Sequence, residues 1–269
     1  DQPSVVLCAY TITNGAPGEA SVRRFIRQNN LNTPPPETVP RKKFETPHIG
    51  DLWLSDFMHG QRFKIDGVRR KLFVCGIIDD HSRLIVGARW TLHENTGALE
   101  RVFKDAVATY GCPKVFYCDN GAVYSTTHLQ KVCARLGVAL VHSKPYDSPS
   151  RGKIERFWRT VREGFLPLVP HDADYSLEEF NQRFAQWLAH HYHRRVHHGT
   201  NQTPLDRFLA DLKNVNLRRL TDVELERYFY QSFQRKVKND ATVPVDSVLF
   251  EVPAKYIGSF VELRHPTGQ

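Results

Sequence analysis

The stretch Asp51-Leu-Trp-Leu-Ser-Asp-Phe-Met58 decides the fold, because its side chains alternate in the period-two pattern of a β-strand. Residues 71–78 follow as a nearly continuous apolar run, which is typical of a central strand buried on both faces. Residues 79–82 predict a turn, and residues 83–90 predict a third strand. Because these three strands are close together in the sequence, we expect an antiparallel meander.

The pattern then alternates between helix and strand. Residues 98–110 and 127–136 have the apolar spacing of amphipathic helices, and each is followed by a short strand, at 114–118 and 138–142. A further helix is expected at 152–163, after a loop that contains two prolines. The sequence therefore predicts an α/β fold, in which three antiparallel strands and two further strands form a mixed sheet flanked by helices.

Three parts are expected along the chain. Residues 1–45 contain three consecutive prolines, which favour an extended linker. Residues 46–215 hold the α/β core and a helical tail, with one long helix from a capping box at Ser176 to about Arg194. Residues 216–269 begin with a short helix and continue as short apolar strands, which predict a small β-barrel.

Composition narrows the class of protein. The 269 residues include 37 Lys and Arg against 29 Asp and Glu, a net charge of +8 that indicates a polyanionic partner such as nucleic acid. No apolar run approaches the length of a membrane span. The five cysteines form no C-x-x-C pair, which argues against a disulfide framework or a zinc knuckle and favours a reducing cytosol.

Three acidic residues are placed where they could bind a metal. Asp56 lies in the first strand, Asp119 ends the fourth, and Glu155 lies in the first turn of the helix that follows the proline-containing loop. Sites in open α/β sheets form beyond the carboxyl ends of strands. Clustered carboxylates repel one another unless a cation neutralises them, and Mg²⁺ prefers such oxygen ligands. The three acids therefore predict a metal site.

The helix around Glu155 has two adjacent faces. Apolar residues recur at helical spacing on one, while Glu155, Arg159 and Arg162 follow at i, i+4 and i+7 on the other. One interpretation is that the carboxylate faces a metal and the arginines face a phosphate backbone. The alternative is a solvent-exposed i,i+4 ion pair, which would contribute only about 0.3–0.5 kcal/mol.

Four ordered motifs resemble the integrase core of bacterial insertion-sequence and Mu-like DDE transposases, a family with a ribonuclease-H-like fold. They are the quoted first strand, Gly76-Ile-Ile-Asp-Asp-His-Ser-Arg83, Cys118-Asp-Asn-Gly121 and Ser150-Arg-Gly-Lys-Ile-Glu155. The 35 residues between Asp119 and Glu155 match the family's spacing. The resemblance extends over about residues 44–204, and the final β-module resembles the barrel that follows the core in Mu-like enzymes.

The resemblance implies roles for individual residues. Asp56, Asp119 and Glu155 would be the catalytic residues and would bind Mg²⁺ or Mn²⁺, with two ions in the site. Asn120 would border the site, either contacting substrate or capping its turn, and Asp79 and Asp80 are interpreted as turn residues. The residues expected to contact DNA are Lys144, Arg151, Lys153, Arg156, Arg159 and Arg162.

Two further features are open to more than one interpretation. The short helix expected at 21–29 would be the remnant of a DNA-binding helix-turn-helix that precedes the core in related transposases. Five histidines between His190 and His198 could bind zinc, but a basic helix end near DNA is the simpler interpretation. Trp158 and Trp187 are expected in the core.

We therefore expect a DDE transposase that cleaves DNA at a 3′ end and transfers the 3′-OH to target DNA. A metal-dependent nuclease of the same fold is one alternative, and a non-catalytic module that binds DNA or docks a partner is another. The expected partners are transposon ends and target DNA, with a homo-oligomer assembled on DNA and an ATPase as a possible regulator. The expected location is the bacterial cytoplasm, at the nucleoid.

Overall fold

The structure is a computed structural model that describes residues 20, 24–25, 28–29, 45–143, 148–245 and 248–265. The chain divides into two compact units, residues 1–43 and 44–269, and the second holds everything described below. The proline-rich linker and most of the expected N-terminal helix lie outside the described residues. None of the described helices combines the length and apolar character that spanning a bilayer requires.

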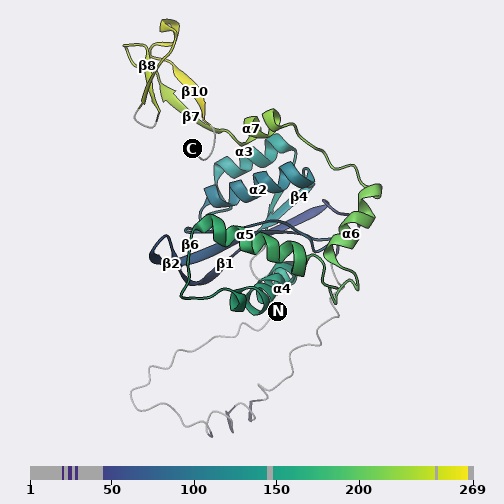
Figure 1. The fold of residues 1–269 in the computed structure, drawn as a ribbon. Helices are drawn as coiled ribbons and strands as arrows, with labels where there is room; N and C mark the ends of the chain where they lie inside the picture. Colours follow the sequence, from purple (N-terminus) through teal and green to yellow (C-terminus); the bar gives the residue numbers. More distant parts are fainter. Residues whose placement is uncertain are drawn as a thin grey trace. The chain divides into compact units, whose positions relative to one another are not determined.

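A mixed sheet with the strand order β3-β2-β1-β4-β5 forms the centre of the larger unit (Figure 1). The long strand β1 (Leu52–Ile65) pairs antiparallel with β2 (Val68–Asp79), which pairs antiparallel with β3 (Ile85–Thr91). On its other edge β1 pairs parallel with β4 (Val115–Cys118), which is followed by β5 (Ala139–His142). The predicted meander and two further strands are therefore confirmed.

One strand goes beyond the prediction. The strand β1 continues to Ile65, well past the stretch that shows the alternation, and its far end pairs with the two-residue strand β6 (Asp174–Tyr175). The hairpin turn contains Asp66 and Gly67, both at positive φ. The sequence pattern does not indicate this extension, because charged side chains between 61 and 71 reach solvent at one end of an otherwise buried strand.

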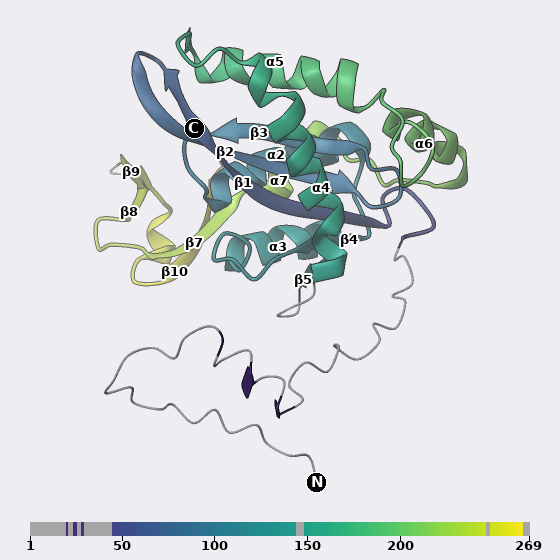
Figure 2. The ribbon, with the colours of Figure 1, turned by 90° about the horizontal axis from the view of Figure 1, so that it is seen from below.

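Helices cover both faces of the sheet and bury two separate cores. The helices α2 (Thr96–Tyr110) and α3 (Thr127–Leu136) pack on one face. The helices α4 (Ser148–Gly164) and α5 (Leu177–Trp187) pack on the other, and Figure 2 shows α4 lying across the strands. Residues of β1 alternate between the two cores, as a strand buried on both faces requires.

Side-chain caps set the bounds of several helices. Asn95 accepts a hydrogen bond from the Ala98 backbone N–H and begins α2, while Thr126 does the same for Leu129 in α3. Gly137, directly after Leu136, ends α3 in the left-handed conformation at φ 67°.

The helical tail differs from the prediction. The single long helix expected from Ser176 to Arg194 is wrong, because α5 ends at Trp187 and a π-helical turn follows over Leu188–Tyr192. A further helix, α6 (Pro204–Asp211), starts at Thr203, whose hydroxyl accepts from the Asp206 backbone. The 3₁₀ turns are Leu166–Leu168, Leu212–Asn214 and Ala254–Tyr256.

The C-terminal region is not the expected closed barrel. After α7 (Asp222–Phe229), which starts at a capping box formed by Thr221 and Glu224, four short strands pair as two separate ladders. Valine and leucine side chains on β9 are half exposed, so the described strands of this region do not share a closed interior. The ladders are β7 (Gln231–Lys236) with β10 (Phe260–His265), and β8 (Thr242–Val245) with β9 (Val248–Glu251).

An ion pair between His128 and Glu100 joins α3 to α2, with 2.6 Å between Nδ1 and the carboxylate. The other ring nitrogen of His128 lies 3.2 Å from the Tyr230 carbonyl. The hydrogen bond to the buried Glu100 carboxylate raises the pKa of His128. Only the protonated ring donates to both partners, so the folded state favours the charged form.

This pair makes stability depend on pH. Since the folded pKa of His128 lies above its unfolded value, the stabilisation is complete below about pH 6.5 and is lost as pH rises through the raised pKa. We expect His128→Gln to lower the free energy of unfolding by about 1 kcal/mol more at pH 6 than at pH 9, measured by urea denaturation. His59→Gln, which removes an exposed pair with Glu94, is the control. Equal losses at both pH values would contradict the assignment.

Candidate active site

Asp56 lies near the centre of β1 with 8% of its surface exposed. Its Oδ2 accepts a hydrogen bond of 3.0 Å from the indole N–H of Trp158, on α4. The backbone partner of Asp56 on β2 is Gly76, and a Cβ there would lie 2.4 Å from the Trp158 ring. A glycine is therefore required at 76, because it lets the indole lie flat on the sheet and reach Asp56.

Asp119 follows the last residue of β4, the strand next to β1. The parallel register pairs Leu54 with Tyr117. Continued two residues further along both strands, the same register places Asp119 opposite Asp56. Leu54 and Tyr117 both pack in the core beneath α4, so the alternation directs Asp56 and Asp119 toward that same face. The Asp119 carboxylate accepts from the Gly121 backbone N–H at 2.8 Å, which shapes the turn after β4.

Glu155 is exposed on α4, one helical turn before Arg159. The cavity beside it has a volume of about 430 Å³ and is lined by Asp56, Glu155 and Trp158 together with Arg162, His59 and their neighbours on β1. The buried face of α4, with Trp158 and Phe157, holds this part of the helix against the sheet. The structure thus brings Asp56 and Glu155 into one cavity.

The third acid is adjacent to this cavity rather than inside it. Asp119 is not one of the residues that line the cavity. Among the described residues, no three carboxylate, imidazole or thiolate side chains lie close enough together to hold a metal ion. Asp56 and Glu155 therefore share one cavity, and Asp119 lies directly after the neighbouring strand β4.

Asp79 and Asp80, interpreted from the sequence as turn residues, are both fully buried. Asp79 accepts from the Gly50 backbone and from the backbone and hydroxyl of Ser82, and its burial raises its pKa. Asp80 accepts from the backbone and hydroxyl of Thr46. They organise the turn after β2 and connect it to the start of the core.

Lys153, predicted to contact DNA, forms an ion pair with Asp80. Its side chain is 15% exposed, and this burial lowers its pKa. Since Lys153 lies two residues before Glu155, the pair joins this end of α4 to the turn after β2. The sequence could not indicate this, because a lysine in a basic motif next to a proposed active site is equally typical of a phosphate contact.

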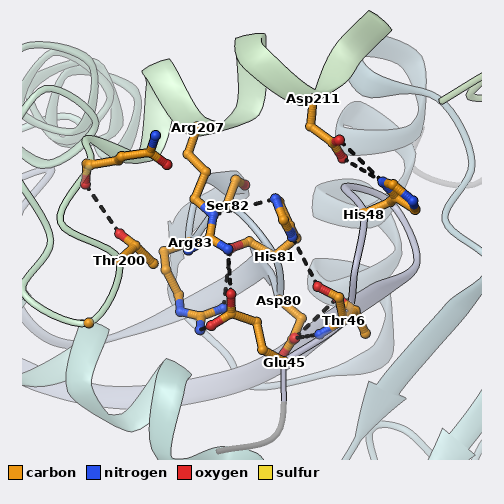
Figure 3. Close-up of polar contacts among 12 residues, drawn as sticks. Glu45, Thr46, His48, Asp80, His81, Ser82, Arg83, Thr200, Arg207 and Asp211 are labelled. Atoms are coloured by element: carbon orange, nitrogen blue, oxygen red, sulfur yellow. Dashed lines mark hydrogen bonds and ion pairs between the residues drawn. The ribbon is translucent and has the colours of Figure 1, made fainter. Parts of the chain in front are cut away.

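Figure 3 shows a wider set of charges around this turn. Glu45 pairs with Arg83 after β2 and with Arg207 on α6. Arg83 is 3% exposed, and its backbone carbonyl accepts from the Tyr192 hydroxyl at 3.1 Å. His48 lies 3.2 Å from Asp211, at the end of α6. These contacts attach the helical tail to the end of the sheet where the turn lies.

The remaining predicted basic residues lie on different sides of α4. Arg162 lines the cavity with Asp56 and Glu155. Arg156 and Arg159 line a separate cavity. Lys144 and the side chain of Arg151 lie outside the described residues.

Asn120 and the histidines have clear local contacts. The Asn120 amide donates to the Ser143 carbonyl at 2.7 Å and so links the ends of β4 and β5. His193 is mostly buried, and desolvation lowers its pKa to about 4. His190 and His191 line a cavity, and the histidines form no metal-binding group among the described side chains. Trp158 and Trp187 are buried, as predicted.

Known families match the part of the chain that carries these features. Residues 47–148 match the integrase core domain family, and residues 136–204 match a second family with the same description. Residues 47–204 of the chain therefore carry an integrase core domain. The predicted family is thereby confirmed, over the region that the motifs indicated.

Individual relatives are distant. The integrase core chain is 26% identical over 186 residues to the transposase of transposon Tn552 from Staphylococcus aureus, which covers 61% of this chain and 38% of that protein. It is 25% identical over 142 residues to a squirrel monkey retrovirus Gag-Pro-Pol polyprotein, covering 49% of this chain and 7% of that one. The chain thus spans less than half of these curated relatives.

A solved structure supports the fold. The simian T-cell lymphotropic virus intasome, in complex with a PP2A regulatory subunit, matches with a TM-score of 0.51 at 18% identity. The match covers 70% of this chain and 65% of that one. The ribonuclease-H-like α/β core is therefore confirmed.

The hydrogen bond from Trp158 to Asp56 can be tested by stability. We expect Trp158→Phe to be about 2 kcal/mol more destabilising than Trp90→Phe in urea denaturation, because it removes a hydrogen bond to a buried carboxylate. Trp90 is a matched control, since it is equally buried and its indole nitrogen has no hydrogen-bond partner among the described atoms. Similar losses in the two variants would show that the N–H contributes little.

The Lys153–Asp80 pair makes a second prediction. We expect Lys153→Met to lower the free energy of unfolding by about 3 kcal/mol, because it leaves a buried carboxylate without its cation. Adding Asp80→Asn should restore part of the loss. Arg162→Gln, on the exposed side of the same helix, should change stability by less than about 0.5 kcal/mol. A stability of Lys153→Met equal to that of Arg162→Gln would contradict the pair.

Proposed function

We propose that this chain is the catalytic part of a DDE transposase that cleaves DNA at a 3′ end and joins the resulting 3′-OH to target DNA. Asp56, Asp119 and Glu155 are its catalytic residues. The observation that carries the proposal is the convergence of Asp56 and Glu155 on one cavity, with Asp119 reached from Asp56 through the parallel β1–β4 register. The family and the net charge of +8 support DNA as the substrate.

The donor set fits magnesium or manganese. Asp56 and Glu155 supply only oxygen ligands at the cavity, and hard divalent cations of this kind bind through one or two carboxylates together with substrate phosphate oxygens. Asp119 would complete the site from the end of β4. When bound, two such ions would stabilise the charge on the attacking and leaving oxygens of an in-line phosphoryl transfer.

The protein's own contribution is to hold the carboxylates in position. The Trp158 N–H holds one oxygen of Asp56, and the Gly121 backbone N–H holds one oxygen of Asp119. Helix α4 carries both Glu155 and Trp158, so the position of one carboxylate and the orientation of another depend on the same helix. Arg162 on the cavity wall is placed to neutralise a substrate phosphate.

The chemistry then needs no covalent enzyme intermediate. A water molecule attacks the phosphodiester at the transposon end, and the bond to the 3′ oxygen breaks to release a 3′-OH. That hydroxyl attacks a target phosphodiester, forming one bond while another breaks, so no external energy source is needed. We further propose that the active form is a multimer on paired DNA ends.

Asp119→Asn tests the proposal directly. We expect it to reduce Mg²⁺-dependent joining of a preprocessed 3′-OH donor to plasmid DNA by at least about a thousandfold, because a neutral amide binds the cation poorly. Retention of the DNA, measured with chelator present, should stay near that of the unaltered chain. Asp172→Asn, at an exposed aspartate in the turn before β6, is the control for removing one carboxylate.

The outcomes separate the candidate functions. Joining by Asp119→Asn at the unaltered rate would refute the assignment of this residue. Donor or plasmid cleavage without joining by the unaltered chain would indicate a nuclease of the same fold. DNA binding that is insensitive to chelation, without cleavage or joining, would indicate a binding module.

A further inference from the structure

A second, larger cavity lies on the other flank of α4 from Asp56 and Glu155. Its volume is about 850 Å³, and it extends from α4 to the segment that follows the π-helical turn. Arg156 and Arg159 line it from α4, while Arg194 and Arg195 line it from that segment. We name this cavity the basic groove.

The charge of the basic groove is strongly one-sided. Four arginines and four histidines line it, against the single carboxylate of Glu163. All four arginine side chains are exposed, and no ion pair joins them to a carboxylate within the part of the chain that the structure describes. Arginines that converge without acidic partners create a positive field that attracts polyanions.

The walls of the basic groove are held in place by the core. The aromatic rings of Phe157, Trp187 and Tyr192 form its base and are at least nine-tenths buried. The Tyr192 hydroxyl is bonded to the Arg83 carbonyl, and the His193 carbonyl accepts from the Leu205 backbone at the start of α6. Arg194 and Arg195 therefore project from an anchored segment, directly after a π-helical turn of a kind that is frequent at functional sites.

These features identify the ligand class. Arginines recognise phosphate oxygens with paired donors, and the exposed arginines suit an extended polyanion better than an enclosed small molecule. Proteins that bind single strands stack the bases on exposed aromatic faces. Here the rings of Phe157, Trp187 and Tyr192 are buried and offer no face on which a base could stack, while the exposed arginines can contact phosphates. Such contacts give affinity without sequence recognition.

We infer that the basic groove binds the phosphate backbone of duplex DNA, at a segment away from the phosphodiester that reacts. The helix α4, roughly 10 Å across, separates the groove from the cavity that contains Glu155. The inference rests on the proposed function for the identity of the DNA, but binding in the groove requires neither metal nor the three acids. One face of α4 thus lines the cavity in which DNA would react, and the other face lines the groove that would retain the DNA.

The test is the salt dependence of DNA binding by the full 269-residue chain, measured with chelator present. For R194Q/R195Q and a duplex of about 30 base pairs, we expect affinity about tenfold below that of the unaltered chain near 0.1 M salt. The slope of log affinity against log salt should become shallower by about 2, one for each lost phosphate contact. The charge-conserving R194K/R195K should keep most of the slope.

K213Q/R219Q is the matched control, because it removes two exposed cations elsewhere on the chain. Equal effects of R194Q/R195Q and K213Q/R219Q on DNA binding would overturn the inference. Displacement of the bound duplex by polyglutamate, but not by additional duplex DNA, would also overturn it. Unfolding midpoints in urea verify that each variant is folded, and Arg194→Gln alone replaces the double variant if the latter is not. A slope change for R194Q/R195Q upholds the inference even if the chain joins no DNA, and an unchanged slope overturns it even if joining is normal.

Discussion

The packing of Trp158 against Gly76 is the contact on which the rest of the site depends. It places α4 across the centre of the sheet at the level of Asp56, because the indole lies on the glycine and its N–H reaches the carboxylate. Glu155, one turn earlier on the same helix, is thereby brought to the cavity beside Asp56. A helix that packed one turn away would separate the two acids.

Much of this arrangement was predictable from the sequence. The alternation after Asp51 and the apolar run before Asp79 are direct consequences of strands buried on one or both faces, and the end of α3 at Gly137 follows local backbone chemistry. The three acids were predicted as a site because they occur in ordered motifs at strand, turn and helix positions. Local patterns of this kind are visible in a single sequence because each involves residues only a few positions apart.

The remaining features depend on contacts between distant residues, which no local pattern encodes. The indole N–H of Trp158 could not be assigned to Asp56, since the two are 102 residues apart. Lys153 resembled a DNA contact until the fold placed it against Asp80. The π-helical turn after Trp187 interrupts a helical pattern that has no proline or glycine to mark its end. The strands after Tyr230 predicted a barrel because short apolar segments do not reveal which of them pair.

The glycine at 76 also constrains how related sequences can vary. Any side chain at that position would occupy the volume of the indole, so a larger residue at 76 is compatible only with a smaller one at 158. Such a pair of changes would also remove the donor to Asp56, and another group would have to replace it. The two positions should therefore covary among homologues, although they belong to different elements and neither is one of the three acids.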